Sequence, residues 1–166
     1  MSATSAYITD RDRAEFTRTA VEAASVARGD FDALTKLATD ALSAPVALIS
    51  LVEADQQCFV GATGLGAPWD ELRATPLSHS FCQHVVSDGE PLFVEDARQH
   101  PRVQDNMAVT ELSVIAYAGI PLILASGQRV GSFCAIDTQP RSWNEKEIAL
   151  LKHFARLAVT SLNCHV

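Results

Sequence analysis

Apolar residues recur at helical spacing near the N-terminus of the chain. Over residues 9–28 they share one face of a predicted helix, with a cap at residues 9–10 and an end at Gly29. Most of them are alanines, so another helix could approach this face closely. A further helix is predicted to begin at Asp30 and to stop before Pro45, because proline disfavours helix in the residue that precedes it.

A second helical pattern closes the chain. Asn144 stands three residues before Glu147, which is the spacing of a capping box, and Trp143 and Ile148 occupy the positions of a hydrophobic staple. The apolar residues that follow cover more than one narrow stripe: Leu150, Leu151, Phe154, Leu157, Ala158 and Leu162. A helix apolar over so wide an arc must bury against a sheet and against a second surface. With the alanine face of the first helix, this pattern predicts a homodimer formed through the terminal helices.

The central part of the chain alternates between short apolar runs and polar turns, which predicts β-strands. The runs cover residues 46–52, 57–62, 91–96, 114–124 and 130–137, and two of the connections are short enough for hairpins. Two further segments are expected to be a loop and an irregular stretch with one helical turn, at residues 63–76 and 97–111. Terminal helices around hairpins predict an α+β fold, with a central antiparallel sheet and the N- and C-terminal helices packed on one face.

Composition narrows the possible functions. The chain has 166 residues and a net charge of -7, which fits one soluble domain and disfavours nucleic acids and anionic membranes as partners. The N-terminus has neither the basic start nor the apolar run of a secretory signal, so a cytoplasmic location is expected. The four cysteines form no CxxC pair and are expected to be reduced thiols.

Five segments of the chain together carry a family pattern. They are ALISLVEADQQCFVGATGL (47–65), SFCQHVV (80–86), PLFVEDARQHPRVQDN (91–106), YAGIPL (117–122) and VGSFCAIDTQPRSW (130–143). In this order and at these spacings they resemble a bacterial GAF domain, a small-molecule sensory module, from about Phe31 to Leu162. The resemblance implies a GAF/PAS-like sheet with a ligand pocket on the face opposite the terminal helices, close to residues 63–84 and 97–113. It implies a single domain over residues 1–166, with a helical extension at 1–29 and a core at 30–163.

The segment SHSFCQH gathers most of the candidate chemistry. With Ser80 as the N-cap and Gln83 three residues later, it predicts a capping box at the start of a helix. Cys82 then lies in the first turn, where the helix dipole favours the thiolate. His79 and His84 take the staple positions and are expected to be neighbours.

Three interpretations of this segment stay open. It is a capped helix with a small buried cysteine, or Cys82 or His84 lines a ligand pocket, or the thiol has a chemical role. The chemical roles are redox chemistry, a covalent chromophore link, or a metal site that includes His79. The metal site is the weakest of these, because three residues on two faces of one helix do not converge easily on one ion.

Catalytic GAF domains supply one alternative. The resemblance extends to free methionine-(R)-sulfoxide reductases, which use cysteines, and Cys82 lies where such a cysteine could sit. That chemistry needs a second thiol to resolve a sulfenic acid, and residues 97–113, where the family places its catalytic partner, contain no cysteine. Cys58 and Cys134 lie in predicted strands and are expected to be core residues.

Cofactor-binding GAF domains supply another alternative. Bilin attachment would use a Cys-His pair, which occurs only at residues 164–165. The sequence does not contain the complete cyclic-nucleotide signature, and only the single residues Asn106 and Asp137 resemble parts of it. Haem ligation by His84 or His100 stays open, because a single pocket histidine can ligate iron.

The remaining pocket candidates lie on loops and strands. Asp96 and Asn106 either order turns or face the pocket. Trp69, on a long loop, is a lid residue or a hydrophobic plug, and Tyr117 is a core residue or a ligand contact. Arg141 is expected to order the turn before the last helix. The predicted pocket set, with no catalytic and no metal-binding member, is Trp69, Phe81, Cys82, His84, Asp96, Asn106 and Tyr117.

The favoured interpretation is a non-catalytic sensory or regulatory domain. It would bind an unidentified small molecule, with no cofactor specified, and signal through its terminal helices. The effector would be a kinase, phosphatase or cyclase, in trans or in a longer chain. A redox enzyme that uses Cys82, a haem or chromophore sensor, and a dimerisation unit with a filled pocket are the alternatives.

Overall fold

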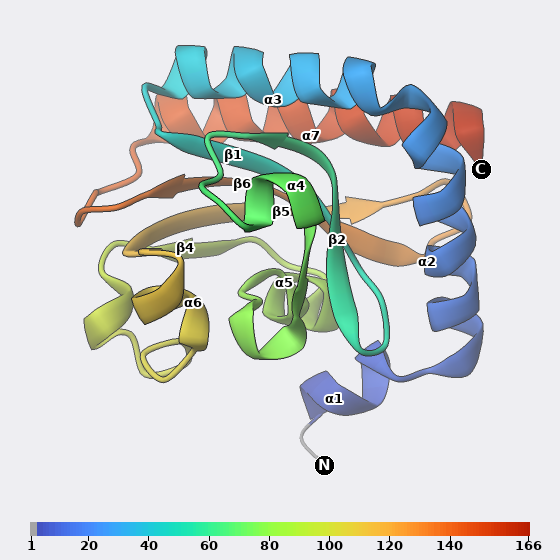
Figure 1. The fold of residues 1–166 in the computed structure, drawn as a ribbon, viewed down its shortest axis with the longest axis horizontal. Coiled ribbons are helices and arrows are strands. Elements are labelled where there is room, and N and C mark those ends of the chain that lie inside the picture. Colours follow the sequence, from blue (N-terminus) through green and yellow to red (C-terminus); the bar gives the residue numbers. More distant parts are fainter. Residues whose placement is uncertain (1–2) are drawn as a thin grey trace.

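The computed structural model describes residues 3–166 as three layers, with a six-stranded sheet between two sets of helices (Figure 1). The strands are β1 (Val46–Val52), β2 (Gln56–Thr63), β3 (Ala74–Pro76), β4 (Leu92–Val94), β5 (Ala116–Ile123) and β6 (Arg129–Asp137). They lie in the order β3-β2-β1-β6-β5-β4, and all neighbours are antiparallel. The predicted α+β fold with an antiparallel sheet is confirmed.

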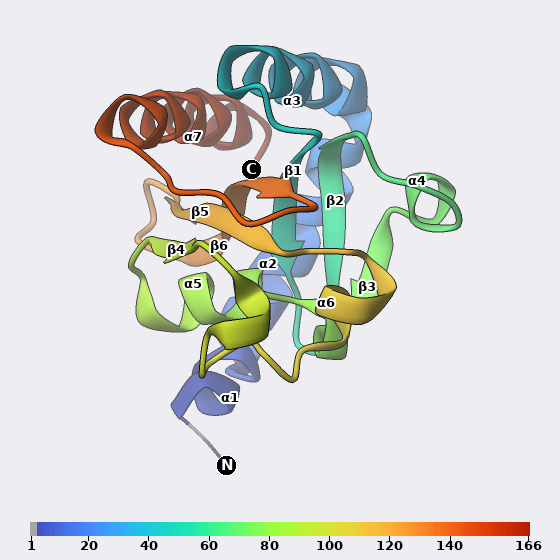
Figure 2. The same ribbon diagram turned by 90° about the vertical axis from the view of Figure 1, so that its left-hand side faces the viewer.

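The helices divide between the two faces of the sheet. The α-helices are α1 (Ala3–Ile8), α2 (Arg11–Ala24), α3 (Arg28–Leu42), α4 (Trp69–Leu72), α5 (Cys82–Asp88), α6 (Met107–Glu111) and α7 (Glu145–His165). Three 3-10 turns are η1 (Ser25–Ala27), η2 (Leu77–His79) and η3 (Ala97–Gln99). Figure 2 shows α3 and α7 side by side on one face, and α1, α5 and α6 on the other. The long terminal helices therefore share one face, as predicted.

The central strands are covered on both faces. In β1, Ala47, Ile49 and Leu51 belong to the core under α3 and α7, whereas Leu48 and Val52 belong to the core under α5. Successive residues of a strand point to opposite faces, so a strand with two covered faces has no polar side. This arrangement explains the continuous apolar runs in the sequence.

The N-terminal helices differ from the prediction in their boundaries. The predicted helix 9–28 is α2 followed by the 3-10 turn η1, and α3 already begins at Arg28. Gly29 and Asp30 therefore lie inside α3, and neither ends a helix nor caps one. The backbone stays right-handed through Ser25 and Arg28, so the chain changes direction without a left-handed glycine.

The segment from α1 to α2 forms a strap that joins the two helical layers. Helix α1 was not predicted from the sequence pattern; it packs against α5, while α2 contacts β6 and α7. Arg13 is buried at the corner, where Nη2 donates to the Ile8 carbonyl at 2.9 Å and Nη1 to Thr17 Oγ1 at 3.2 Å. The N-terminal extension, of which residues 1 and 2 lie outside the described residues, thus reaches both faces.

The predicted loop 63–76 contains regular structure. It includes the short helix α4 and the edge strand β3, which pairs with β2. Arg73 ends α4 in the left-handed region, and its guanidinium donates to Asp32 and to the Phe59 carbonyl. This tertiary anchor, at which α3 meets the sheet edge, has no local signature in the sequence.

The predicted start of the last helix is confirmed. Asn144 and Glu147 form a complete capping box at the N-terminus of α7. Arg141, expected to order the preceding turn, donates to the carbonyls of Leu42 and Ser43 and to Glu147. It therefore ties the end of α3 to the start of α7. Within residues 3–166, no helix is both long and apolar enough to span a bilayer.

Candidate functional site

A partly open apolar cavity of about 40 Å³ lies between the sheet and the helices α5 and α6. A water needs roughly 10–15 Å³ of such space, whereas ligand pockets usually measure roughly 300–1,000 Å³. The lining residues come from β1, β2, β5 and β6 below and from the covering segments above: Val46, Leu48, Gln57, Phe59, Leu65, His79, Phe81, Cys82, Ala108, Leu112, Val114, Tyr117, Cys134 and Ile136. In this conformation the pocket is largely filled by its own side chains.

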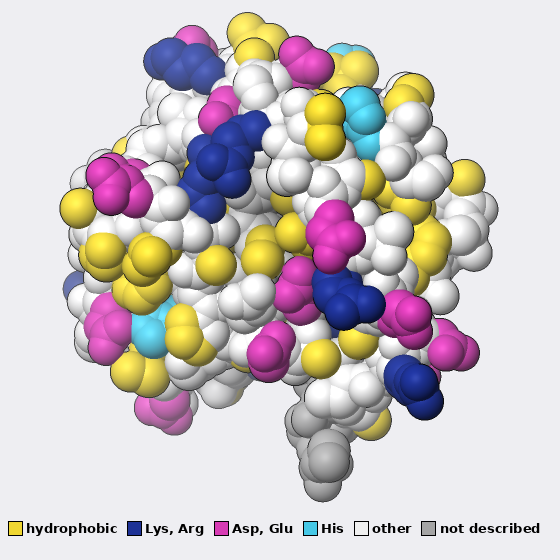
Figure 3. Space-filling model, turned by 45° about the vertical axis from the view of Figure 1, so that its right-hand side comes forward, with side chains coloured by type: hydrophobic (Ala, Val, Ile, Leu, Met, Phe, Trp, Pro, Cys, Tyr) yellow, Lys and Arg dark blue, Asp and Glu magenta, His cyan; other side chains and the backbone are white. Residues whose placement is uncertain are grey.

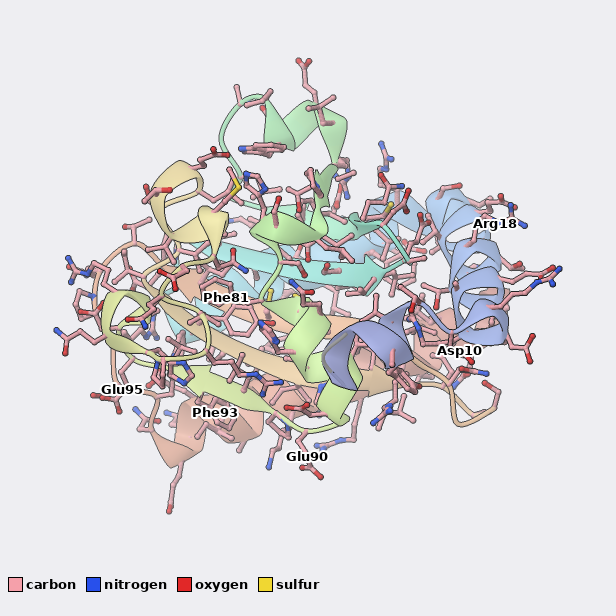
Figure 4. The ribbon with its side chains drawn as sticks, turned by 90° about the horizontal axis from the view of Figure 1, so that it is seen from below. Asp10, Arg18, Phe81, Glu90, Phe93 and Glu95 are labelled. Atoms are coloured by element: carbon pink, nitrogen blue, oxygen red, sulfur yellow. The ribbon has the colours of Figure 1, made fainter. Side chains whose placement is uncertain are left out.

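Three of the predicted pocket residues line this cavity: Phe81, Cys82 and Tyr117. The rings of Phe81 and Tyr117 pack at a tilt, with centroids 5.2 Å apart. Figure 4 shows Phe81 in the interior, whereas Asp10, Arg18, Glu90 and Glu95 lie towards the outside of the molecule. All three residues are buried, so they contribute to the core as well as to the cavity wall.

Trp69 and Asn106 act on the cavity from outside it. The ring of Trp69 packs at a tilt against the ring of His79, with centroids 5.6 Å apart, and His79 itself lines the cavity and bonds to Glu111 on α6. Asn106 caps α6 and donates to the Ser80 carbonyl at 3.0 Å. Both residues hold covering segments in place, and direct ligand contact by either one stays a prediction.

Asp96 and His84 lie away from the cavity. Asp96 caps η3 and pairs with Arg98, which is turn chemistry. His84 faces Asp88 and Arg102, and its Nδ1 atom is buried without a hydrogen-bond partner. Burial first, and the charge of Arg102 second, lower the pKa of His84 from 6.5 to about 4, so the ring is neutral at pH 7.

The segment SHSFCQH folds as predicted only in part. Ser80 Oγ accepts from the backbone N–H of Gln83 at 3.1 Å, which is one half of the capping box. The other half of the capping box is not formed. The Gln83 amide donates to the carbonyls of Ser80 and Leu77, and the Ser80 N–H donates to the Leu77 carbonyl instead of to the Gln83 side chain. The helix begins at Cys82, the first position of α5.

The prediction that His79 and His84 occupy staple positions as neighbours is wrong. His79 lies in η2 between Trp69 and Glu111, whereas His84 lies on α5 beside Asp88. The 3-10 turn separates the two histidines by rotating His79 towards α6. Within residues 3–166 no group of three or more histidine, cysteine or acidic side chains could hold a metal ion.

The side chain of Cys82 has a thiol neighbour that the sequence analysis did not identify. Its Sγ atom lies 4.0 Å from Sγ of Cys134 on β6 and 3.1 Å from the hydroxyl of Tyr117. Tyr117 in turn bonds to Ser132 Oγ at 3.2 Å. Cys134 is a buried core residue, as expected, but it is also a second thiol beside Cys82; such a thiol was expected only from residues 97–113, which contain no cysteine.

The two buried thiols differ in acidity. Hydrogen bonds from the thiol of Cys134 and from the hydroxyls of Tyr117, Ser50 and Ser132 lower the pKa of Cys82, although burial opposes them. Burial raises the pKa of Cys134 well above its ordinary value. The cluster thus favours a thiolate at Cys82 and a neutral thiol at Cys134.

A buried hydrogen-bond network continues from this cluster towards the sheet edge. Gln57 Oε1 accepts from Ser50 and Ser80, and Gln57 Nε2 donates to Thr75 Oγ1 at 2.8 Å. Nε2 also donates to the His79 carbonyl at 3.3 Å. The network links β1, β2 and β3 to the N-terminus of α5, so it fixes the position of Cys82 relative to the sheet.

The signal that would have identified Cys134 is the period of two along the strands. Ser50 in β1 and Ser132 in β6 pair across the sheet, and Cys134 is two residues from Ser132 on the same face. Polar residues that pair across two otherwise apolar strands lie on the same face of the sheet, here the face that carries Cys134. Using this signal requires knowing that β1 pairs with β6, which the sequence alone does not specify. Cys58, expected in the core, is only half-buried and bonds to Glu53 instead.

The family model of the GAF domain matches residues 30–162. The chain belongs to the GAF domain family. A cyclic di-GMP phosphodiesterase of Pseudomonas aeruginosa is 36% identical over 135 residues, which cover 80% of this chain and 22% of that protein. The chain therefore spans only about a fifth of the length of this relative.

Solved structures share the GAF fold at low sequence identity. A domain of a putative sensor histidine kinase from Sinorhizobium meliloti is 23% identical, with a TM-score of 0.63, and the match covers 81% of this chain and 89% of that domain. A type II free methionine-R-sulfoxide reductase from Thermoplasma acidophilum is 12% identical, with a TM-score of 0.67 and coverage of 86% and 96%. At these identities the likeness shows the fold alone.

Proposed function

We propose that this GAF domain is a non-catalytic sensory module that binds a small molecule beneath α5 and α6 and regulates an effector. The observation that carries the proposal is the cavity itself, which is apolar and covered by short segments. The relative from P. aeruginosa supports an effector link, because its name describes a phosphodiesterase and the match covers 22% of it. A kinase, phosphatase or cyclase in trans or in a longer chain is the effector class proposed here.

Ligand entry in this proposal requires the cover to move. A cavity of about 40 Å³ is too small for a metabolite, so α6 and η2 must separate from the sheet. The bond between His79 and Glu111 and the ring contact of Trp69 with His79 hold them closed. A ligand would shift the population towards an open form by its differential affinity, and the closed form would lower its apparent affinity.

The signal would leave through the opposite face of the same strands. β1 and β6 line the cavity on one side and carry the core under α3 and α7 on the other. We propose a homodimer through the terminal helices, supported by the exposed apolar side chains of Val26, Leu37 and Leu157. Acidic and basic side chains are interspersed in Figure 3, which supports a protein or small-molecule partner over nucleic acid.

Native mass spectrometry of freshly purified protein tests ligand binding and dimerisation together. We expect a dimer that retains a small organic molecule, or that binds one member of a panel of cyclic mononucleotides, cyclic dinucleotides, haem and biliverdin. Ala108→Leu, which fills the cavity, should abolish that binding, whereas Thr110→Leu on the exposed side of α6 should not. A monomer without bound mass and without any thermal shift across the panel would contradict the proposal.

A further inference from the structure

We propose that Cys82 and Cys134 form a hydroperoxide-sensitive dithiol, which a hydroperoxide oxidises to an intramolecular disulfide. Their sulfur atoms lie 4.0 Å apart, and both residues line the same cavity. The inference stands whether or not the cavity also binds a regulatory ligand.

The two thiols belong to packed but separate elements. Cys82 is the first residue of α5, Cys134 lies in β6, and α5 packs directly on β6. A disulfide requires a sulfur–sulfur distance of about 2.05 Å, so the gap must close by about 2 Å. A small shift of α5 together with rotation of both side chains can supply that movement.

The surroundings give the two cysteines different roles. The hydroxyl of Tyr117, 3.1 Å from Cys82 Sγ, stabilises a thiolate there together with Ser50 and Ser132. The pKa of Cys134 is raised by burial, so this residue stays protonated. Cys82 is therefore the attacking sulfur, and Cys134 is the thiol that resolves the product.

The reaction balances with a hydroperoxide as the only co-reactant. The Cys82 thiolate attacks the O–O bond, an S–O bond forms, and the alkoxide or hydroxide that leaves takes up the proton that Cys82 released. The Cys134 thiol then attacks the sulfur of the sulfenic acid, the S–S bond forms and water leaves. Two thiols are oxidised by two electrons in total, and one hydroperoxide is reduced to an alcohol or water.

The size of the cavity selects the oxidant. About 40 Å³ accommodates roughly three water-sized positions, which is enough for hydrogen peroxide with its two heavy atoms. Free methionine sulfoxide is much larger and would require the cover to open. Hydrogen peroxide should thus oxidise the pair under conditions in which methionine sulfoxide does not.

The test uses the full chain with Cys58→Ser and Cys164→Ser, so that Cys82 and Cys134 are the remaining thiols. After hydrogen peroxide and quenching with N-ethylmaleimide, we expect an intact mass lower by two hydrogen atoms, no maleimide adduct, and a Cys82–Cys134 cross-linked peptide. Methionine sulfoxide should leave both thiols available for labelling after unfolding. Circular dichroism melting checks that this variant folds like the parent protein.

Single variants in the same background test the assigned roles. With Cys134→Ser, dimedone should trap a sulfenic acid at Cys82, whereas with Cys82→Ser no sulfenic acid should form at Cys134. Cys82→Ala and Cys134→Ala should also lose the cross-link. Labelling of both thiols after peroxide treatment, or oxidation to sulfinic acid without a cross-link, would overturn the proposal. Neither outcome bears on ligand binding, which native mass spectrometry measures separately.

Discussion

The side chain of Tyr117 lies across Gly119, so closely that a Cβ atom at position 119 would be 2.3 Å from the Tyr117 hydroxyl oxygen. Two carbon atoms of the ring would also be within 2.7 Å. The missing side chain of Gly119 allows the ring to reach Cys82 and Ser132. Within the YAG sequence of residues 117–119, the buried cluster therefore requires a glycine two residues after the tyrosine.

Gly119→Ala should displace the Tyr117 ring and break its bonds to Cys82 and Ser132. Because Tyr117 is fully buried, its displaced ring has no free space to enter and would overpack the core. We expect a loss of about 1–3 kcal/mol in the free energy of unfolding. Urea denaturation measures the change. Gly66→Ala is the matched control, since a Cβ there meets nothing within 4 Å, and equal losses in both variants would contradict the explanation.

Tyr117→Phe should remove the hydroxyl and keep the ring. We expect a loss of about 1 kcal/mol of stability and a higher pKa at Cys82, because one donor to its thiolate disappears. The thiolate absorbance followed against pH, in the background without Cys58 and Cys164, measures the pKa. Tyr7→Phe, on α1, should leave that titration unchanged, and an unshifted titration in Tyr117→Phe would exclude the proposed role of the hydroxyl.

Arg141→Ala should separate the end of α3 from the start of α7. The guanidinium donates to two backbone carbonyls and to Glu147, and it lies over the Trp143 ring at 4.6 Å. We expect a loss of about 2–3 kcal/mol, only partly restored by Arg141→Lys, because lysine cannot reproduce the planar fork. Thermal and urea unfolding measure it. The exposed Arg156→Ala should change stability by no more than about 0.5 kcal/mol, and a similar loss there would show a general charge effect.

The stability of the domain should fall between pH 6.5 and about pH 4 through His84. Its pKa is lowered in the folded state from 6.5 to about 4, so in this window the unfolded chain binds a proton that the folded chain does not. The stabilisation is complete above pH 6.5 and is lost as the pH falls. The side chain is partly exposed and its surroundings include Asp88, Arg102 and His100, so we expect about 1–2 kcal/mol after solvent screening.

Urea unfolding across this pH range measures the effect. His84→Gln should flatten the pH dependence, whereas the exposed His153→Gln should leave it unchanged. If the slope of stability against pH persists in His84→Gln, another group carries it.

The sequence predicted those features that depend on short-range pattern. The capping box of Asn144 and Glu147, the hairpin strands and the helix stop before Pro45 are local, and the structure has each of them. The pairing of Cys82 with Cys134 depends on the contact of α5 with β6, across 52 positions of the chain. No local pattern specifies such a contact, so it could not be predicted without strand register.

The same limit explains the errors at the N-terminus and at the histidines. The boundary expected at Gly29 depended on a glycine that the backbone there does not need, since Arg28 and Ser25 are right-handed. His79 was placed by its spacing from His84, but contacts with Trp69 and with Glu111, which is 32 positions away, determine where its ring lies. Tertiary contacts therefore determine the position of His79, and the local backbone conformation determines the helix boundary.

The strap of α1 and α2 has a consequence for how much of the chain is needed as a folding unit. The family match begins at residue 30, yet α1 covers α5, and the corner at Arg13 is anchored to the carbonyls of Ile8 and Arg129. A protein cut to the matched residues should expose the side of α5 that α1 covers and leave this helix, which carries Cys82, held mainly by the sheet. We therefore expect the cooperative folding unit to begin on the N-terminal side of α1, well before the first residue of the family match.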